Sequence, residues 1–345
     1  MKESKILITG GTGYLGSWVV KGLLEKGYTV RLTVRNRNKK EGYRHLSAIA
    51  ESTPGSLEIY EADLLIPGSF DKAATGADAI IHMASPFQLD VKDAQKELVD
   101  PALKGTRNVL EAANNSDTVK KVVLTSSVAA VHGDNIDMKE QGLNEFSEVH
   151  FNTSSSLTHQ PYSYSKVVAE KEAWKIFKSQ EQWKLVVMNP VFVMGPTLSL
   201  NSSSESLKFM DDMLSGKFRM GAPDLQFGYV DVRDVANAHI LALENERAEG
   251  RYILSERTAG VYDLARIIED KFPGKYKLPR MVSPKPLLYL IGWMFGLKWK
   301  FIKRNVGHPI KLNNTKSKKD LGLVYTPLEK TIEDMVLQKQ MKKKE

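Results

Sequence analysis

Short apolar runs alternate along the chain with longer segments in which apolar residues recur at helical spacing. Most of the runs are rich in β-branched side chains, which is typical of strands buried on both faces; they cover residues 5–9, 28–34, 57–61, 79–83, 121–126 and 184–188. Helical spacing marks residues 17–26, 92–113 and 161–178. Strands separated by helices of this size predict a doubly wound α/β fold, a parallel sheet of the Rossmann type with helices on both faces.

Charge and cysteine content narrow the possible functions. The chain has 345 residues, no cysteine and a formal net charge of +8. Without cysteine there is no disulfide, no thiolate metal ligand and no cysteine nucleophile, and we predict no metal site and a cytoplasmic location. The first residues lead directly into a strand-like run, so we expect no signal peptide. No apolar stretch has the roughly 20 residues that a membrane-spanning helix needs.

Basic residues cluster at 35–40, 298–304 and 342–344. A nucleic-acid-binding protein would carry aromatic residues along a long basic stripe. Only the short cluster at residues 298–304 combines basic and aromatic residues, and it is not a long stripe. We therefore predict no nucleic-acid partner. The cluster at 342–344 is expected to be a solvated tail.

A glycine motif links the first predicted strand to the first helix. Gly10, Gly13 and Gly16 stand three residues apart in the sequence TGGTGYLG. The first glycine permits a tight turn, the second lets backbone approach a pyrophosphate, and the third allows close packing of helix on strand. The helix start, with Tyr14 and Leu15, then offers N–H groups to the phosphates. We predict a dinucleotide site here; the alternative is a plain glycine-rich turn.

The end of the second predicted strand favours NADP(H) over NAD(H). NAD-binding chains usually place an acidic residue here for the ribose 2′-hydroxyl, whereas this chain has LTVRNRNKK at 32–40. Arg35 can stack on adenine and bind a 2′-phosphate, with Lys40 or Lys39 as a second cation. The alternative is a solvated basic loop.

Residues at the ends of the third and fourth predicted strands are further candidates for the cofactor. We expect Asp63 and Leu64 to hold the adenine. The small residues around Met83, Ala84 and Ser85 would let backbone pass close to a ribose.

Tyr162 and Lys166 form a YxxxK motif directly after Pro161, which is favoured at the first position of a helix. Residues four apart share one helix face, so both side chains can meet one ligand. A nearby ammonium is expected to lower the pKa of the phenol and to bind the nicotinamide ribose. Tyr164 is two residues from the lysine and points away. The alternative is an ordinary tyrosine and lysine on a helix surface.

Ser127 lies where the fifth predicted strand ends, in the sequence LTSSVAAV, close to Thr125. A parallel sheet presents ligands at this edge, and a serine hydroxyl there could bind a carbonyl oxygen as negative charge develops on it. The alternative is a turn residue.

Together these segments resemble the extended short-chain dehydrogenase/reductases. The resemblance rests on TGGTGYLG, LTSSVAAV, PYSYSK, NPVFVMGP at 189–196 and FGYVDVRDVANAH at 227–239. It is closest to the dihydroflavonol-reductase-like branch, which includes cinnamoyl-CoA reductases and yeast-type methylglyoxal and ketone reductases. It implies a catalytic triad of Ser127, Tyr162 and Lys166. We also expect a monomer or homodimer.

The resemblance also implies contacts that the residue types alone do not predict. The cofactor would contact Thr125, Pro190, Val193 and a serine among 202–204, taken as Ser204. The substrate would contact Pro86 and His132 as well as Ser127 and Tyr162; for His132 the alternative is a loop histidine with no special role.

Two features depart from the branch. Tyr229 stands where many relatives carry histidine. Residues 284–302 are apolar and aromatic, then basic, and residues 301–323 are more similar to sterol-type members. Residues 284–302 form either a helix that covers the substrate pocket or an interfacial helix that lies on a membrane. In the second interpretation, two tryptophans lie at a membrane surface and four cations lie near the lipid headgroups; these residues are Trp293, Trp299, Lys298, Lys300, Lys303 and Arg304.

We therefore predict NADPH-dependent reduction of a bulky, aromatic or flavonoid-like ketone or aldehyde, with Tyr162 donating the proton. The alternatives are oxidation of a sterol-type 3β-alcohol with NAD⁺, a nucleotide-sugar epimerase or dehydratase, and a regulatory protein that senses NADP(H).

We also predict two structural parts with the pocket between them. Residues 1–190 would form the cofactor domain, and 227–256, which include a further strand at 251–255, would return to it. Residues 191–226 and 257–345 would form a smaller substrate-binding part.

Overall fold

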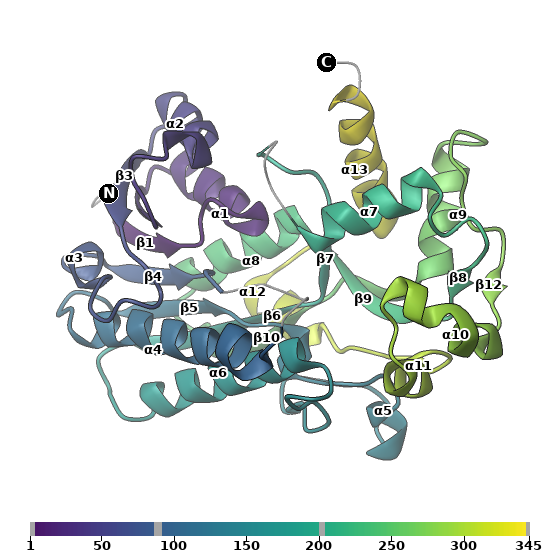
Figure 1. Ribbon diagram of the computed structural model, residues 1–345. Coiled ribbons are helices and arrows are strands. Elements are labelled where there is room, and N and C mark those ends of the chain that lie inside the picture. The colour runs from purple at the N-terminus through teal and green to yellow at the C-terminus, as the bar shows by residue number, and fades with distance from the viewer. Residues whose placement is uncertain (1–3, 86–91, 200–203, 343–345) are drawn as a thin grey trace.

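The computed structural model describes residues 4–85, 92–199 and 204–342. Its main sheet has seven strands, all parallel, in the order β10-β6-β5-β4-β1-β2-β3 (Figure 1). The strands are β1 (Lys5–Thr9), β2 (Thr29–Val34), β3 (Ser56–Glu61), β4 (Ala79–His82), β5 (Lys121–Thr125), β6 (Lys184–Pro190) and β10 (Gly250–Leu254). The predicted doubly wound parallel sheet is confirmed, and the predicted strands differ from the observed ones by at most two residues at an end.

Helices cover both faces of this sheet because successive strand side chains point to opposite faces. Ile6 and Ile8 of β1 pack into one core with α1 (Tyr14–Glu25) and α8 (Val232–Glu244). Leu7, between them, packs into the other core. That core contains residues of α3 (Asp71–Ala74), α4 (Asp100–Asn114) and α6 (Pro161–Phe177). Two further helices lie beside the sheet: α2 (Arg44–Glu51) packs on α1 and β3, and α12 (Thr315–Leu321) packs on β10 and α8. The short helix α5 (Asp137–Glu140) lies near α11 (Trp299–Asn305), where its acidic residues pair with Arg304.

The helix predicted over 92–113 is interrupted. A π-helical turn, Gln95–Val99, precedes α4, and Pro101 is the second residue of α4. Proline has no N–H group to continue the hydrogen-bond pattern of the preceding turn. The regular helix therefore begins only at Asp100.

A second group of elements surrounds a three-stranded sheet, in the order β11-β9-β7. These strands are β7 (Phe192–Met194), β9 (Gln226–Asp231) and β11 (Arg257–Gly260). Tyr229, at the centre of β9, is fully buried against Phe192 and Phe227. Its ring fills the core of this second part, so packing accounts for an aromatic residue at this position.

Further helices and one small sheet complete the second part. They are α7 (Glu205–Ser215), α9 (Val261–Lys271), α10 (Lys285–Ile291), α11 (Trp299–Asn305), α13 (Leu328–Lys342) and the pair β8 (Ala222–Pro223) with β12 (Val282–Ser283). Within the described residues, no helix combines the length and apolar character that a bilayer crossing needs.

The segment 227–256 is shared between the two parts. Its first strand, β9, belongs to the three-stranded sheet, whereas α8 packs on α1 and β10 pairs with β6 in the main sheet. The division into a cofactor domain and a substrate-binding part stays a prediction.

Candidate active site

The glycine loop after β1 meets the loop after β4, because β1 and β4 are neighbours in the main sheet. Gly10 has φ +72°, and a Cβ atom on it would lie 2.6 Å from the Ala84 backbone nitrogen. A Cβ atom on Gly16 would lie 2.2 Å from the Gly10 carbonyl oxygen. Only glycine fits these two positions.

Helix α1 begins at Tyr14 directly after this turn. The first N–H groups of a helix have no partner within it and attract an anion. A crowded glycine cradle in front of a helix start fits the pyrophosphate of a dinucleotide. The Tyr14 side chain points elsewhere, since its hydroxyl donates a hydrogen bond to the Gly195 carbonyl at 2.7 Å. The backbone N–H is therefore the group of Tyr14 that could bind a phosphate.

Thr9 and His82 brace the two loops. Thr9 Oγ1 lies 2.7 Å from His82 Nδ1 and accepts a hydrogen bond from the Ala84 N–H at 3.1 Å. Burial lowers the pKa of His82 to about 3, and the Lys166 ammonium acts in the same direction. His82 is therefore neutral near pH 7, and the motif analysis missed both residues.

The basic loop after β2 leaves its cations exposed. Arg35 and Lys40 are both solvent-exposed, while the loop backbone is held by Tyr43, whose hydroxyl donates to the Arg37 carbonyl at 2.7 Å. Exposed cations on a fixed loop beyond β2 fit a 2′-phosphate.

Asp63 and Leu64 form a turn after β3. Asp63 Oδ1 accepts a hydrogen bond from the Leu65 N–H at 2.8 Å. The Asn108 side chain donates to the Leu64 carbonyl at 3.3 Å. The Asp63 carboxylate thus supports the turn, and contact of either residue with adenine stays a prediction.

Helix α6 begins at Pro161, as predicted, after Gln160 in a left-handed conformation with φ 53°. Lys166 is 8% exposed. Its Nζ donates a hydrogen bond to Ser85 Oγ at 2.9 Å and lies 5.6 Å from the centre of the Tyr162 ring. The YxxxK pair and the loop after β4 thus meet at one edge of the sheet.

The protonation states at this edge follow from burial. Burial raises the pKa of Tyr162 to about 12, partly offset by a hydrogen bond with the Ser127 side chain. Burial also lowers the pKa of Lys166 to about 8. The pKa of the phenol is thus raised and not lowered as expected, because the cost of burying a phenolate dominates the net shift. Tyr162 is therefore a neutral phenol that can donate a proton.

Glu170, one turn after Lys166, is a buried acid that the motif analysis also missed. It is 1% exposed. Its carboxylate accepts hydrogen bonds from Ser126 Oγ at 2.5 Å and Asn189 Nδ2 at 2.8 Å, and Oε1 lies 2.6 Å from Arg251 Nε. It joins α6 to Ser126 directly after β5, to Asn189 near the end of β6 and to Arg251 in β10. Its position four residues after Lys166 on the same helix face was the available signal.

A cavity of about 20 Å³ lies behind the lysine, enough for one water molecule. Its lining includes His82, Ser85, Thr125, Lys166 and Glu170. Thr125 Oγ1 lies 2.7 Å from His239 Nε2, a histidine on α8. Polar groups therefore surround the lysine from several strands.

His132 lies in the loop after β5 and stacks on Phe146, with ring centres 5.0 Å apart. Burial lowers its pKa to about 4, and its Nδ1 has no hydrogen-bond partner among the described residues. It is a neutral ring at pH 7, and contact with substrate stays a prediction.

The other predicted contacts fall at four places. Pro190 ends β6 and Val193 lies in β7. Ser204 caps α7 by accepting a hydrogen bond from the Ser206 N–H. Pro86 lies outside the described residues. Contact of these residues with cofactor or substrate stays a prediction.

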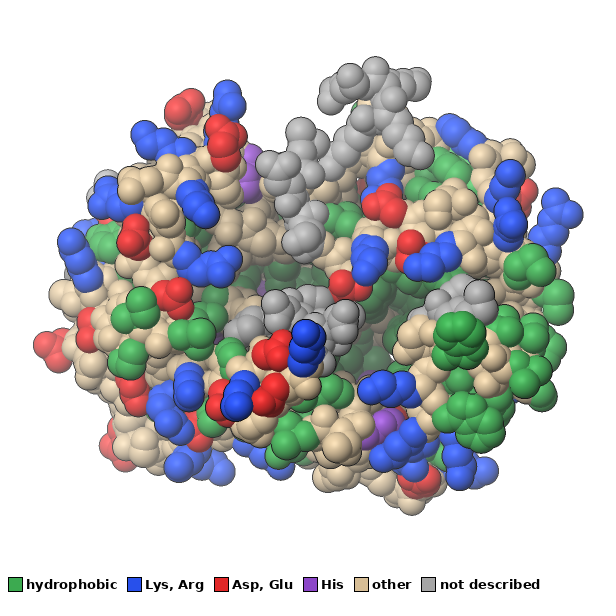
Figure 2. All heavy atoms as spheres, in the orientation of Figure 1, with side chains coloured by type: hydrophobic (Ala, Val, Ile, Leu, Met, Phe, Trp, Pro, Cys, Tyr) green, Lys and Arg blue, Asp and Glu red, His purple; other side chains and the backbone are tan. Residues whose placement is uncertain are grey.

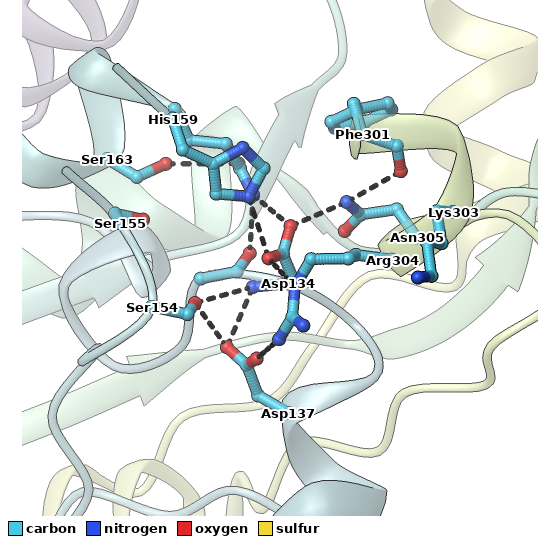
Figure 3. Close-up of polar contacts among 12 residues, drawn as sticks. Asp134, Asp137, Ser154, Ser155, His159, Ser163, Phe301, Lys303, Arg304 and Asn305 are labelled. Carbon is cyan, nitrogen blue, oxygen red and sulfur yellow. Dashed lines mark hydrogen bonds and ion pairs between the residues drawn. The ribbon is translucent and has the colours of Figure 1, made fainter. Parts of the chain in front are cut away.

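A buried polar cluster joins the loop after β5 to the start of α6 and to α11 (Figure 3). Asp134 is fully buried. It accepts hydrogen bonds from Gln160 Nε2 at 2.6 Å, Arg304 Nε at 2.5 Å and Asn305 Nδ2 at 2.7 Å, and lies 2.8 Å from His159 Nε2. It therefore positions the residue that precedes Pro161.

Figure 2 shows one face of the molecule hollowed near its centre. The hollow lies between the part that carries β1 to β5 and the part that carries α7, α9, α10 and α11, and hydrophobic side chains lie within it. The arrowheads of β4 and β5 in Figure 1 point toward this region. A hollow at the carboxyl ends of parallel strands is the usual place for a ligand in an open α/β sheet.

Comparisons with known proteins identify the family of the chain. Residues 6–254 match the family described as the NAD dependent epimerase/dehydratase family. The chain is 38% identical to a cinnamoyl-CoA reductase of Medicago truncatula over 336 residues, covering 96% of this chain and 94% of that one. It is 32% identical to a bifunctional dihydroflavonol 4-reductase/flavanone 4-reductase of Malus domestica, covering 81% and 79%.

Among solved structures, Gre2 of Candida albicans in complex with NADPH is similar, with a TM-score of 0.77 and 34% identity over 97% of this chain and 98% of that one. The chain therefore belongs to the NAD-dependent epimerase/dehydratase family, in the dihydroflavonol-reductase-like branch of the extended short-chain dehydrogenase/reductases.

Proposed function

We propose that this protein reduces a bulky or aromatic ketone or aldehyde to the alcohol, with Tyr162 as the proton donor. The protein is an NADP-dependent oxidoreductase, as predicted from its motifs. NADPH supplies the hydride when it is bound. The glycine cradle at Gly10 and Gly16 and the exposed cations after β2 are the features that fit this cofactor.

One observation carries the proposal: a neutral phenol, a serine hydroxyl and an ammonium meet at the carboxyl edge of the sheet. Tyr162 and Ser127 share a hydrogen bond, so both hydroxyls can face one carbonyl oxygen. Tyr162 gives its proton to that oxygen as negative charge develops there. The Lys166 ammonium, one helix turn away, stabilises the phenolate that remains.

The substrate class is supported by the apolar hollow and by the relatives. The similar proteins include reductases named for cinnamoyl-CoA and dihydroflavonols. His132, whose partly exposed ring stacks on the buried ring of Phe146, is the predicted aromatic contact for the substrate. A substrate with an aromatic or similarly broad carbonyl group fits such a pocket.

The test is NADPH consumption by the purified full chain against aliphatic ketones, aromatic aldehydes, flavonoids, a cinnamoyl thioester and steroids, with NADH in parallel. We expect turnover of aromatic or bulky carbonyl compounds with NADPH. Oxidation of a 3β-hydroxysteroid with NAD⁺ in place of that turnover would favour the sterol alternative. NADPH binding without turnover of any compound would favour the regulatory alternative.

A further inference from the structure

The positive charge of this protein is concentrated in one segment. Residues 271–319 contain 13 of the 49 Lys and Arg and none of the 41 Asp and Glu. The rest of the chain therefore has 36 cationic and 41 anionic side chains. The net positive charge of the whole chain therefore comes from residues 271–319, since the rest of the chain has a net negative charge.

The same segment carries a group of exposed apolar side chains. Trp293 is 76% exposed, Leu290 72% and Trp299 69%, and Met281, Val282 and Leu287 are each at least 40% exposed. The other three tryptophans of the chain are buried or partly buried. We call these six exposed apolar residues, with the exposed cations Arg280, Lys298, Lys300 and Lys303, the basic apolar face.

The helices that present this face already bury their other sides. Leu288, Ile302 and Val306 form a small core between α10 and α11, and the Tyr289 and Trp299 rings lie 4.4 Å apart. The Lys285 ammonium donates to the Val306 carbonyl at 2.7 Å. The exposed residues are thus what remains outside a packed pair of helices.

The face is attached firmly to the rest of the protein. Arg304 and Asn305, at the end of α11, bind the buried carboxylate of Asp134 (Figure 3). Figure 2 shows hydrophobic side chains gathered at the edge of the molecule where Figure 1 places α10 and α11, with Lys and Arg side chains nearby. The apolar area is therefore part of a fixed surface.

We propose that the basic apolar face docks on a membrane surface that contains anionic lipids. Tryptophan is favoured at the boundary between headgroups and acyl chains, and lysine and arginine are attracted to anionic headgroups. Exposed tryptophans beside cations, in a segment without a single acidic residue, match both requirements. This contact would hold the reductase where apolar carbonyl compounds dissolve, and it is independent of the proposed chemistry.

Vesicle flotation of the full chain tests the proposal. We expect the protein to float with vesicles of phosphatidylcholine and phosphatidylserine and to bind vesicles of phosphatidylcholine alone at least about tenfold more weakly. Because Trp293 and Trp299 are the exposed tryptophans, binding should also shift the tryptophan fluorescence to shorter wavelength.

Two variants separate the contributions of the face. W293S/W299S and K298E/K300E should each weaken binding to the mixed vesicles at least about tenfold. Lys298 and Lys300 lie at the start of α11, where acidic residues favour a helix, so K298E/K300E should remain folded. Unchanged NADPH affinity would verify folding.

Matched control variants carry the same changes elsewhere. K175E/K178E reverses two exposed cations near the end of α6, and V149S/V324S removes two exposed apolar side chains. Both controls should bind vesicles like the wild type.

Three results would overturn the proposal. The wild type stays unbound in the presence of anionic vesicles; W293S/W299S binds them as tightly as the wild type; or the face instead joins two copies of the chain. The last result would appear in sedimentation velocity as a dimer that W293S/W299S abolishes, without any flotation.

Discussion

The Lys166 ammonium donates a hydrogen bond to Ser85 Oγ at 2.9 Å, joining residues 81 positions apart. The contact ties the first turns of α6 to the loop that leaves β4. That loop also touches the glycine turn, since the Ala84 N–H donates to Thr9 Oγ1. The nucleotide cradle and the helix that carries Tyr162 are therefore one connected structure.

Removing the Tyr162 hydroxyl should abolish most activity without loss of cofactor binding. In Tyr162→Phe the proton donor is absent, so we expect kcat to fall by a factor on the order of 10² or more. Steady-state kinetics with an NADPH titration measures both effects. Tyr164→Phe is the matched control and should keep wild-type turnover; near-native turnover of Tyr162→Phe would contradict the assignment.

Activity should fall as the pH rises above about 8. The pKa of Lys166 is lowered to about 8 by burial, so the ammonium is present below that pH and is lost above it. Tyr162, with its pKa raised to about 12, stays protonated throughout this range. The pH dependence of kcat/KM reports ionisations of the free enzyme, so we expect log kcat/KM to decline above about pH 8 and to form an alkaline limb there.

Lys166→Arg provides the control for that limb. Arginine keeps its charge at this pH, so the variant should lose the alkaline limb even though its turnover is lower. The same limb in both proteins would mean that another group is titrating.

Arg35→Ser should weaken NADPH binding and leave NADH binding nearly unchanged. A charge-assisted hydrogen bond to a 2′-phosphate contributes about 1.5–3 kcal/mol, which corresponds to a rise of roughly 10- to 150-fold in the KM for NADPH. Lys72→Ser removes an exposed cation on α3 and should have no effect. An equal loss with both cofactors would assign Arg35 to adenine stacking or loop structure.

Asp134→Asn should destabilise the fold more than removal of an exposed partner of the same arginine. The substitution removes the fully buried carboxylate that pairs with Arg304, while the second buried partner, Asp137, remains. We therefore expect a cost at the lower end of the range for a broken buried ion pair, about 3 kcal/mol. Glu140→Gln removes an exposed partner of Arg304 and should cost less than about 1 kcal/mol. Urea unfolding compares the two variants; equal losses would mean that Asp134 contributes no more than an exposed ion pair.

Stability should fall as the pH is lowered below about 6.5, partly because of His239. Burial lowers the pKa of this fully buried histidine to about 4. The unfolded chain therefore binds the proton first, which favours unfolding by about 2 kcal/mol at pH 5 relative to pH 7. His239→Gln should flatten the dependence of the unfolding free energy on pH; an unchanged slope would assign it to other groups.

The local sequence was enough for the features that depend on spacing along the chain. The alternation of strands and helices predicted the parallel sheet. The three glycines predicted a crowded turn before α1, and Pro161 predicted the start of α6. Each of these depends on backbone geometry within a few residues, so the order of residue types determines it.

Only the tertiary structure decided which distant groups meet and how burial changes their charge. Glu170 touches Arg251, and Asp134 binds Arg304, across separations that no local pattern encodes. The direction of the Tyr162 pKa shift was predicted wrongly. Sequence spacing shows that an ammonium lies near the phenol, but it does not show how completely the folded chain removes water from the phenol. Desolvation is set by everything packed around a group, and that is a property of the folded chain alone.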